Sequence, residues 1–505
     1  MALSSERRET GTGRSYARAW VMLLLLIAGP AIRAQETTSP APVAAQTVKL
    51  GSLDFSLNWR SRVEHWSWFE GGSGESGYAF GHSQLRVGIG QKRGRVDWLV
   101  EGEQVAILGL PIDAVAPAPL GQLGLGATYY AANGNHENNA NAFLKQAYLD
   151  LKRLGPMRLK FGRFEFFDGA EAKSADPVIT AVVQARIAHR LISNFGFTAV
   201  QRTFDGAQFE WTTGSREVTA FAARPTAGIF QVDGMNELDV QIYYGAYNAS
   251  IKTRFGAGSL RVFGIHYVDT RSAALKTDNR STAAREADQR DIAVDTWGAD
   301  YVHAFHTTTA GTFDVLGWGA VQTGRWGTLT QRAGAFVGEA GWQAPASAVK
   351  PWVSAGYSYG SGDSDPNDAR HGTFFQLLTT PRQYARFPFY NMMNNEDAYA
   401  TLNLLPLPKL AMRSELHRLW LADAADLWYL GGGAFQQGTF GYQGRPSNSS
   451  PNLSTVWDVS ADYQLTRFLN ATLYYAHASG NSVIAGTYPN RKDGALAYVE
   501  TTVHF

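Results

Sequence analysis

The chain has 505 residues, of which 45% are hydrophobic and 12% aromatic, and it contains 52 glycines and no cysteine. Its 45 lysines and arginines nearly balance its 44 aspartates and glutamates. This balance excludes a global attraction to nucleic acid, so any charge selection must come from local groups. After the first forty residues, no apolar run approaches the roughly 20 residues of a membrane-spanning helix.

The N-terminus has the three parts of a secretory signal peptide. The apolar run Trp20–Ile32 is followed by Ala34 and preceded by four arginines, Arg7, Arg8, Arg14 and Arg18. At about 13 residues, the run is too short for the alternative, a membrane anchor. We therefore expect a signal peptide over residues 1–34, cut near Ala34, and a flexible leader over 35–50. Without residues 1–34, which hold five arginines and two glutamates, the chain has 40 basic and 42 acidic groups.

The stretch Phe143–Asp168 shows how strands and turns alternate along this chain. Two runs of about ten residues flank a break in which Gly155 and Pro156 suit a turn. In the second run, apolar residues at odd positions from Met157 alternate with Arg158 and Lys160 at even positions. The two sets therefore face opposite sides of a strand.

The whole chain after residue 50 repeats this pattern in about eighteen runs. Many reach ten to fourteen residues, longer than the usual five or six of soluble strands. The predicted strands are Leu53–Trp66, Phe80–Gln91, Arg95–Val105, Phe143–Leu151, Met157–Phe166, Thr203–Thr213, Arg216–Ala223, Leu238–Thr253, Ser259–Asp269, Ile292–His306, Gly311–Gln322, Gln331–Ala344, Pro351–Gly360, Glu396–Leu405, Lys409–Trp420, Thr455–Gln464, Phe468–His477 and Ala495–Phe505. A further apolar run, Leu427–Phe435, has three consecutive glycines and no clean alternation, so we assign it to a loop.

Connections between the runs fall into two classes that alternate along the chain. The short ones lie near Lys92–Gly94, Arg153–Gly155, Gly214–Ser215, Gly256–Gly258, Thr307–Ala310, Pro345–Lys350, Pro406–Pro408 and Leu465–Arg467. The long ones lie near Ala106–Asn141, Asp168–Arg202, Thr270–Asp291, Gly362–Asn395 and Leu421–Ser454. This predicts an all-β fold over residues 51–505: a transmembrane up-and-down antiparallel barrel of about 18 strands, with short periplasmic turns and long extracellular loops.

The last run, Ala495–Phe505, alternates and ends in phenylalanine. Such an end is typical of the closing strand of a bacterial outer-membrane barrel, through which we expect the barrel-assembly machinery to act. A soluble β-protein that ends in a strand is the alternative.

One long loop contains a predicted helix. Asp176 and Pro177 open the segment 177–191, with aspartate at the cap and proline at the first helical position. We expect this helix to pack on or in the mouth of the barrel.

Charged residues on the polar faces of the strands are the candidate site. On the lipid side each would cost about 2–4 kcal/mol at mid-membrane, so we expect them to face the lumen. Rings of arginine favour anions, and guanidinium groups suit carboxylates. A blander interpretation is that they only solvate a wide lumen and pair with Glu64, Glu101 and Asp97. The set read from the strands is Arg60, Arg62, Glu64, Arg86, Arg158, Lys160, Arg413, Glu415 and His417.

Signatures of catalysis or cofactor binding are not found. The acidic loop Asp363–Asp368 lacks the glycine and glutamate of a calcium-binding EF-hand, so we predict a solvated turn and no metal site, with loose calcium binding as the alternative. Motifs of hydrolases and nucleotide-binding proteins are missing as well. A barrel enzyme stays open only as a minor alternative, and no cofactor is predicted.

Four segments, Leu144–Gly169, Gln201–Trp211, Asn394–Tyr429 and Val456–Gly480, resemble the alginate export family of outer-membrane barrels. The resemblance implies a monomeric barrel with an arginine-lined, anion-selective lumen and a role in export of the polyuronate alginate. It adds four residues to the candidate lumen set, namely Lys145, Arg163 of a Gly-Arg signature, and Arg202 and Asp205 of an Arg-x-x-Asp stretch.

The chain departs from alginate exporters in one connection. These proteins have a longer periplasmic segment before the penultimate strand, whereas here the link is only Leu465–Arg467. The difference argues against a plug from below and against dedicated alginate export.

We therefore predict an outer-membrane channel for an anionic solute, such as an alginate-like uronate polysaccharide. A general porin of low selectivity is the alternative. Expected partners are the lipid bilayer with lipopolysaccharide and periplasmic polysaccharide-export proteins, and no nucleic acid.

Overall fold

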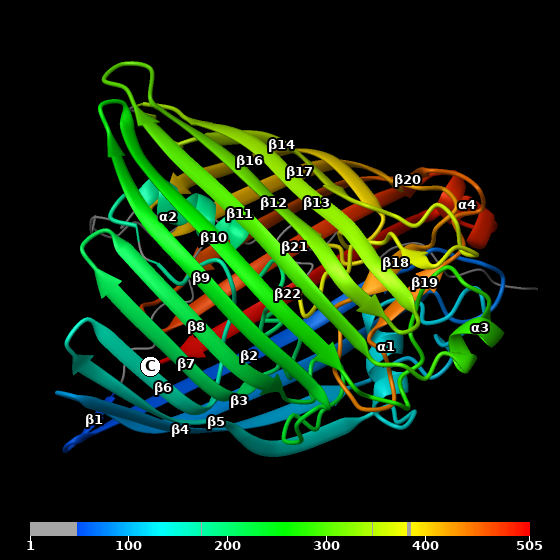
Figure 1. Cartoon of the computed structure of the whole chain (residues 1–505), viewed down its shortest axis with the longest axis horizontal. Coiled ribbons are helices and arrows are strands. Elements are labelled where there is room, and N and C mark those ends of the chain that lie inside the picture. Colours follow the sequence, from blue (N-terminus) through cyan, green and yellow to red (C-terminus); the bar gives the residue numbers. More distant parts are fainter. Residues whose placement is uncertain (1–47, 173, 346, 381–384) are drawn as a thin grey trace, which may run out of the picture. The chain divides into compact units, whose positions relative to one another are not determined.

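Eighteen antiparallel strands close into one barrel in the computed structural model, which describes residues 48–172, 174–345, 347–380 and 385–505 (Figure 1). Consecutive strands pair with one another, and the last, β22, closes the sheet by pairing with β2. The predicted fold class is therefore confirmed. The wall consists of β2 (Leu53–Ser67), β3 (Gly77–Arg93), β4 (Val96–Leu108), β5 (Asn139–Leu154), β6 (Met157–Phe164), β7 (Phe204–Thr213), β8 (Arg216–Pro225), β9 (Val240–Thr253), β10 (Gly256–Asp269), β11 (Ile292–His306), β12 (Thr312–Trp326), β13 (Leu329–Gln343), β14 (Trp352–Gly360), β16 (Asn395–Leu407), β17 (Leu410–Trp420), β20 (Asn452–Gln464), β21 (Leu469–Gly480) and β22 (Asp493–His504).

Smaller elements lie in the connections and at the start of the described chain. The run that we assigned to a loop contributes β18 to a hairpin outside the wall, so its exclusion from the barrel is correct. The elements are β1 (Val48–Leu50), β15 (Arg370–His371), β18 (Trp428–Gly431), β19 (Tyr442–Arg445), α1 (Leu125–Ala132), α2 (Pro177–Val182), the π-helical turn η1 (Val183–Ile187), α3 (Thr282–Ala287) and α4 (Ser482–Thr487).

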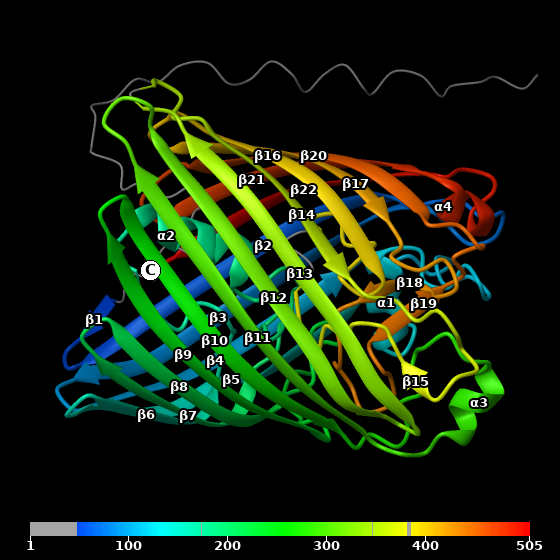
Figure 2. The same ribbon diagram turned by 45° about the horizontal axis from the view of Figure 1, so that its top comes forward.

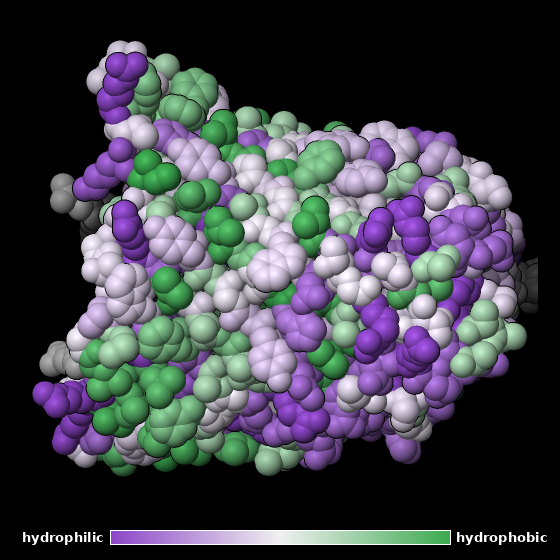
Figure 3. Space-filling model, in the orientation of Figure 1, coloured by the Kyte–Doolittle hydropathy of each residue, from purple (hydrophilic) through white to green (hydrophobic). Residues whose placement is uncertain are grey.

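Alternation along each strand separates the two faces of the wall. In β2, Trp59 and Val63 are 47% and 60% exposed on the outside, whereas Arg62 and Glu64 are buried inside. Figure 3 shows hydrophobic side chains spread over the strands, with hydrophilic ones gathered at the right-hand end, where the long loops lie. The outer face thus suits hydrocarbon, and the inner face collects the charges.

The two ends of the barrel differ as predicted, with one exception. Two-residue turns join β3 to β4, β5 to β6 and β7 to β8 at one end, and the long loops leave from the other. However, β12 and β13 are joined at the long-loop end by only Gly327 and Thr328, so long and short connections do not alternate strictly. Gly327 allows this tight turn because its φ is +60°. The turn predicted at Gly256–Gly258 lies instead at residues 254–255.

The loop between β6 and β7 runs through the inside of the barrel. Asp176 caps α2 by accepting hydrogen bonds from the backbone N–H groups of Val178 and Ile179, as predicted. The Nε2 atom of His306, the last residue of β11, lies 2.6 Å from the Asp176 carboxylate. Because β11 ends at the short-turn end, the loop must cross the interior from the opposite end. Figures 1 and 2 show α2 behind β10 and β11, near the short turns.

Both ends of the described chain are held at β2. Phe505 and Leu57 exchange backbone hydrogen bonds of 2.7 and 3.0 Å. Val48–Leu50 pair with the start of β2, so the last three residues of the predicted flexible leader are a strand instead. The predicted signal peptide and the rest of the leader lie outside the described residues. Among the described residues, no helix has the length and apolar character needed to cross a membrane.

Candidate functional site: the lumen of the barrel

Polar side chains of the strands point into the barrel, as β17 (Leu410–Trp420) illustrates. Leu416 is 53% exposed outside, whereas its neighbours Glu415 and His417 are buried inside. The Nδ1 atom of His417 lies 2.9 Å from Asp397 of β16. Arg413 shares this inward face by the same period of two.

Arg60 and Arg62 hold the inward loop rather than standing free in a pore. Arg60 donates hydrogen bonds to the backbone carbonyl oxygens of Gly196 (2.6 Å) and Thr198. Arg62 donates to the carbonyl oxygen of Phe197 (3.0 Å) and to Glu500 of β22 (2.6 and 2.8 Å). Three successive loop carbonyls are therefore held by two strand arginines, and hydrogen bonds from charged donors are the stronger kind.

Glu64, the third residue of this inward face, is fully buried. It accepts a hydrogen bond from the indole of Trp66 (2.9 Å) and lies 3.2 Å from Arg62. The Nε2 atom of His82 of β3 is 3.5 Å away. Glu64 therefore neutralises the arginine beside it, as the blander interpretation expects.

A second group of contacts joins β3 and β5 to the same loop. Arg86 donates to Glu103 (2.6 Å) and to Glu165 (3.0 Å), the first residue after β6. Lys145 donates to the carbonyl oxygen of Val200 (2.8 Å). Lys145 reaches inward because the β4–β5 register shifts at this residue, where two residues of β5 face one of β4.

Glu415 is the centre of a third group. It accepts hydrogen bonds from Arg413, from Thr401 (2.9 Å) and from Arg186 (2.8 Å) of the inward loop. Arg186 also lies 3.2 Å from Glu339 of β13. One buried carboxylate therefore links two strands to the loop, and it takes up part of the positive charge predicted for the pore.

Arg158 and Lys160 lie near the short turns and do not bind the inward loop through any described contact. Arg158 makes a bidentate pair with Asp150 (2.6 and 2.8 Å) and contacts Glu210 (2.9 Å). The Lys160 ammonium lies 4.2 Å from the ring centre of Tyr148. Both are lumen residues held by neighbouring strands.

Arg163 and Asp205 contradict the prediction, because they face outward. Arg163 is six residues after Met157 and two after Phe161, both exposed on the lipid side, and no register shift intervenes between Phe161 and Arg163. Its guanidinium makes a bidentate pair with Asp205 on the outer face (2.5 and 2.7 Å). Because side chains alternate between the two faces of a strand, both residues point away from the lumen, at the long-loop end of the wall.

Arg202 also differs from the prediction. It is fully buried among the loops and donates to the carbonyl oxygen of Gly432 (2.8 Å). It precedes β7 and does not belong to a strand face, so it does not line a path along the wall.

Several charged residues of the lumen were not among the candidates. Glu339 and Glu500 lie on the polar faces of β13 and β22, and their alternation could have revealed them. Arg186 and Arg386 lie in loops, where no period points to the barrel interior. Arg386 donates to Ser460 of β20 (2.7 Å).

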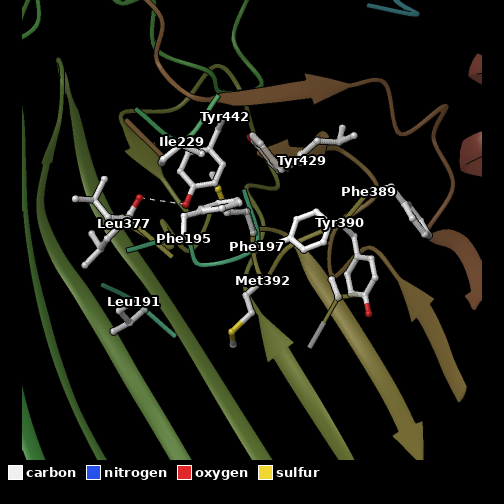
Figure 4. Close-up of a cluster of buried hydrophobic side chains, with 14 of the residues drawn as sticks. Leu191, Phe195, Phe197, Ile229, Leu377, Phe389, Tyr390, Met392, Tyr429 and Tyr442 are labelled. Carbon is white, nitrogen blue, oxygen red and sulfur yellow. Dashed lines mark hydrogen bonds between the residues drawn. The ribbon is translucent and has the colours of Figure 1, made fainter. Parts of the chain in front are cut away.

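An apolar core formed by the loops fills part of the lumen. Figure 4 shows Leu191, Phe195 and Phe197 of the inward loop beside residues of two other loops, among them Leu377 and Tyr442. The Tyr442 hydroxyl donates to the carbonyl oxygen of Leu377 (3.1 Å). These side chains are buried, so the loops pack against one another as well as against the wall.

Two loop carboxyl groups are shifted toward their neutral forms. Burial raises the pKa of Asp168 to about 6, although Arg261 and two backbone N–H groups oppose the shift. Burial also raises the pKa of Asp426 to about 7, although it accepts a hydrogen bond from Thr373 (2.5 Å).

The described residues contain no group of three or more acidic, histidine or cysteine side chains that could hold a metal ion.

A family model described as "Alginate export" matches residues 52–493, which is nearly the whole barrel. The chain belongs to the alginate export family. Together with its closed barrel of 18 strands, this membership makes the alginate export family protein an outer-membrane channel-type barrel. No curated protein matches its sequence.

Solved structures with the same fold are porins of low sequence identity. OccAB2 of Acinetobacter baumannii matches with a TM-score of 0.56 and 9% identity, over 90% of this chain and 99% of that chain. A BenF-like porin of Pseudomonas fluorescens Pf-5 matches with a TM-score of 0.53 and 8% identity, over 90% and 100%. OpdK of Pseudomonas aeruginosa matches with a TM-score of 0.51 and 10% identity, over 90% and 99%. At this identity, the likeness establishes the fold alone.

Proposed function

We propose that this alginate export family protein is a channel for anionic solutes, and that acidic sugar chains of the uronate type are the class to test first. The carrying observation is a set of three lumen arginines, Arg60, Arg386 and Arg413, whose side chains remain partly exposed inside the barrel, although the terminal nitrogens of Arg60 also hold the loop. Their side chains are 11%, 18% and 12% exposed. A guanidinium that keeps open donors can bind a passing carboxylate.

The family description and one structural neighbour support the same solute chemistry. The family model is described as alginate export, and alginate is a polyuronate. OpdK has been solved with vanillate, which is also a carboxylate. A free carboxylate on the solute is the feature that these two cases share.

Carboxylates in the same lumen favour a second candidate, a porin of low selectivity. Glu415 and Glu500 each contact arginines of the proposed path, and Asp458 and Asp462 lie on β20, the strand next to β17. Such pairing weakens the field of the arginines. The balance between the two candidates therefore depends on how much positive charge remains for the solute.

Reversal potentials in planar bilayers under a potassium chloride gradient test the proposal. We expect a preference for chloride that falls in Arg386→Ala and in Arg413→Ala. Arg163→Ala is the matched control, because it removes one arginine from the outer face and should leave the preference unchanged. A preference for potassium in the wild-type channel would overturn the proposal.

Blocking by sugar acids tests the solute class. Oligomers of a uronic acid should interrupt the current at lower concentration than neutral oligosaccharides of equal length. Equal blocking by both would favour the porin of low selectivity.

We also propose that the N-terminal signal peptide directs the chain to the periplasm and that the barrel acts as a monomer.

A further inference from the structure

A cavity of about 140 Å³ opens at the long-loop end, where six loops meet. Its deep side is aromatic, formed by Trp66, Phe195, Phe197, Phe230 and Phe435. These residues come from the end of β2 and from three different loops, so only the closed barrel brings them together. A dry cavity of roughly 150 Å³ with apolar walls can hold one benzene molecule. The volume therefore suits a single six-membered ring.

The mouth of the cavity has uncharged polar groups. Gln122 accepts a hydrogen bond from the Thr128 hydroxyl (2.9 Å), and Gln443 donates to the same Gln122 oxygen. Gln436 donates to Thr439 on the other side of the mouth. Amides and hydroxyls of this kind can exchange their mutual hydrogen bonds for bonds to a ligand hydroxyl.

Charged side chains are missing among the described residues that line this cavity. Two arginines contact lining residues without lining the cavity themselves. The Arg62 guanidinium lies 4.0 Å from the centre of the Phe197 ring, and Arg445 donates to the Gln443 side-chain oxygen (3.1 Å). Phe195 and Phe197 face the cavity, while the carbonyl groups of Gly196 and Thr198 bind Arg60 in the lumen. The donors of Arg60 are thus used on the loop backbone and do not enter the cavity.

We propose that this cavity is a binding site for a small, neutral, monocyclic aromatic molecule that carries a hydroxyl group. The aromatic walls stack on the ring, and the glutamine and threonine groups at the mouth bind the hydroxyl. A carboxylate on the same ring is disfavoured, since none of the described lining residues is a cation that could compensate its desolvation. The site therefore accepts a different class of molecule from the anion path below it.

Phenol is the probe, titrated by calorimetry into the full mature protein in lipid nanodiscs, with empty nanodiscs to subtract partition into lipid. We expect saturable binding of phenol and binding of benzoate at pH 7 that is weaker by about tenfold or more. Ala131→Phe, on the α1 side, and Thr439→Phe, at the mouth, fill the cavity and should each abolish the saturable signal. Ile112→Phe adds a ring to the same β4–β5 loop outside the cavity and should leave it unchanged.

Two outcomes would overturn the site. The first is phenol uptake that never saturates, or that is the same in both filled variants as in the wild type, which would mean lipid partition only. The second is benzoate binding as tight as phenol binding. Melting curves confirm that each variant is folded. Because equilibrium binding needs no ion current, a failure here is distinct from a failure of the proposed anion channel.

Discussion

Replacing Arg60 by alanine should weaken the hold of the wall on the inward loop. Arg60 donates two hydrogen bonds to loop carbonyls, those of Gly196 and Thr198. A hydrogen bond from a charged group contributes about 1.5–3 kcal/mol. At the low end of this range, the two bonds together amount to about 3 kcal/mol, which changes the ratio of docked to undocked loop by about a hundredfold. Arg62 remains in the variant and keeps its bond to Phe197, so undocking is increased and not complete.

Single-channel recording measures this change. We expect Arg60→Ala to open to its high-conductance level far more often than the wild type, because the loop occupies part of the lumen only when docked. Arg158→Ala is the matched control. Arg158 is also a lumen arginine, but it binds Asp150 and Glu210 of the wall, so its loss removes the same charge and leaves the loop held.

The reasoning would be refuted by either of two results. One is an Arg60→Ala channel that opens no more often than the wild type. The other is an equal increase in Arg158→Ala, which would show that loss of lumen charge, and not loss of the loop contact, changes the opening.

Three further predictions concern other charged groups. Glu415→Gln should raise the preference for anions in reversal-potential measurements, because Arg186 and Arg413 lose their shared carboxylate; an unchanged potential would mean that neither arginine faces the ion path. Arg163→Ala should lower the free energy of unfolding by about 1–3 kcal/mol, measured by urea titration, since Asp205 loses a bidentate partner; no loss of stability would mean that the outer pair is solvated and weak. For Asp426, the folded pKa of about 7 lies above the ordinary 3.8, so its ionisation destabilises the folded loops between about pH 4 and pH 7. Over that range the melting temperature of the wild type should fall more steeply with rising pH than that of Asp426→Asn, and parallel profiles would contradict the shift.

The lumen shows which of its side chains the two-residue alternation of the strands can predict. The period of two is enough to place Arg60, Arg86, Arg158 and Glu415 on the inner face, because successive side chains of a strand point to opposite sides. The same period, counted from Met157, places Arg163 on the outer face. The family resemblance placed Arg163 in the lumen, so at this position alternation predicts the direction of the side chain better than the resemblance does. Lys145 is the opposite case. Its inward direction depends on a register shift between β4 and β5, and an alternating pattern contains no mark of such a shift.

The loops show what the sequence could not predict. Alternation, turn residues and strand length determined the barrel by themselves, because every strand must present an apolar face to lipid and satisfy its backbone through its neighbours. The inward path of the β6–β7 loop was decided only by tertiary structure. Gly196, Phe197 and Thr198 bind Arg60 and Arg62 through backbone carbonyls, which every residue carries and no sequence motif identifies. For that reason, only the folded structure could show that the predicted pore arginines also hold a loop.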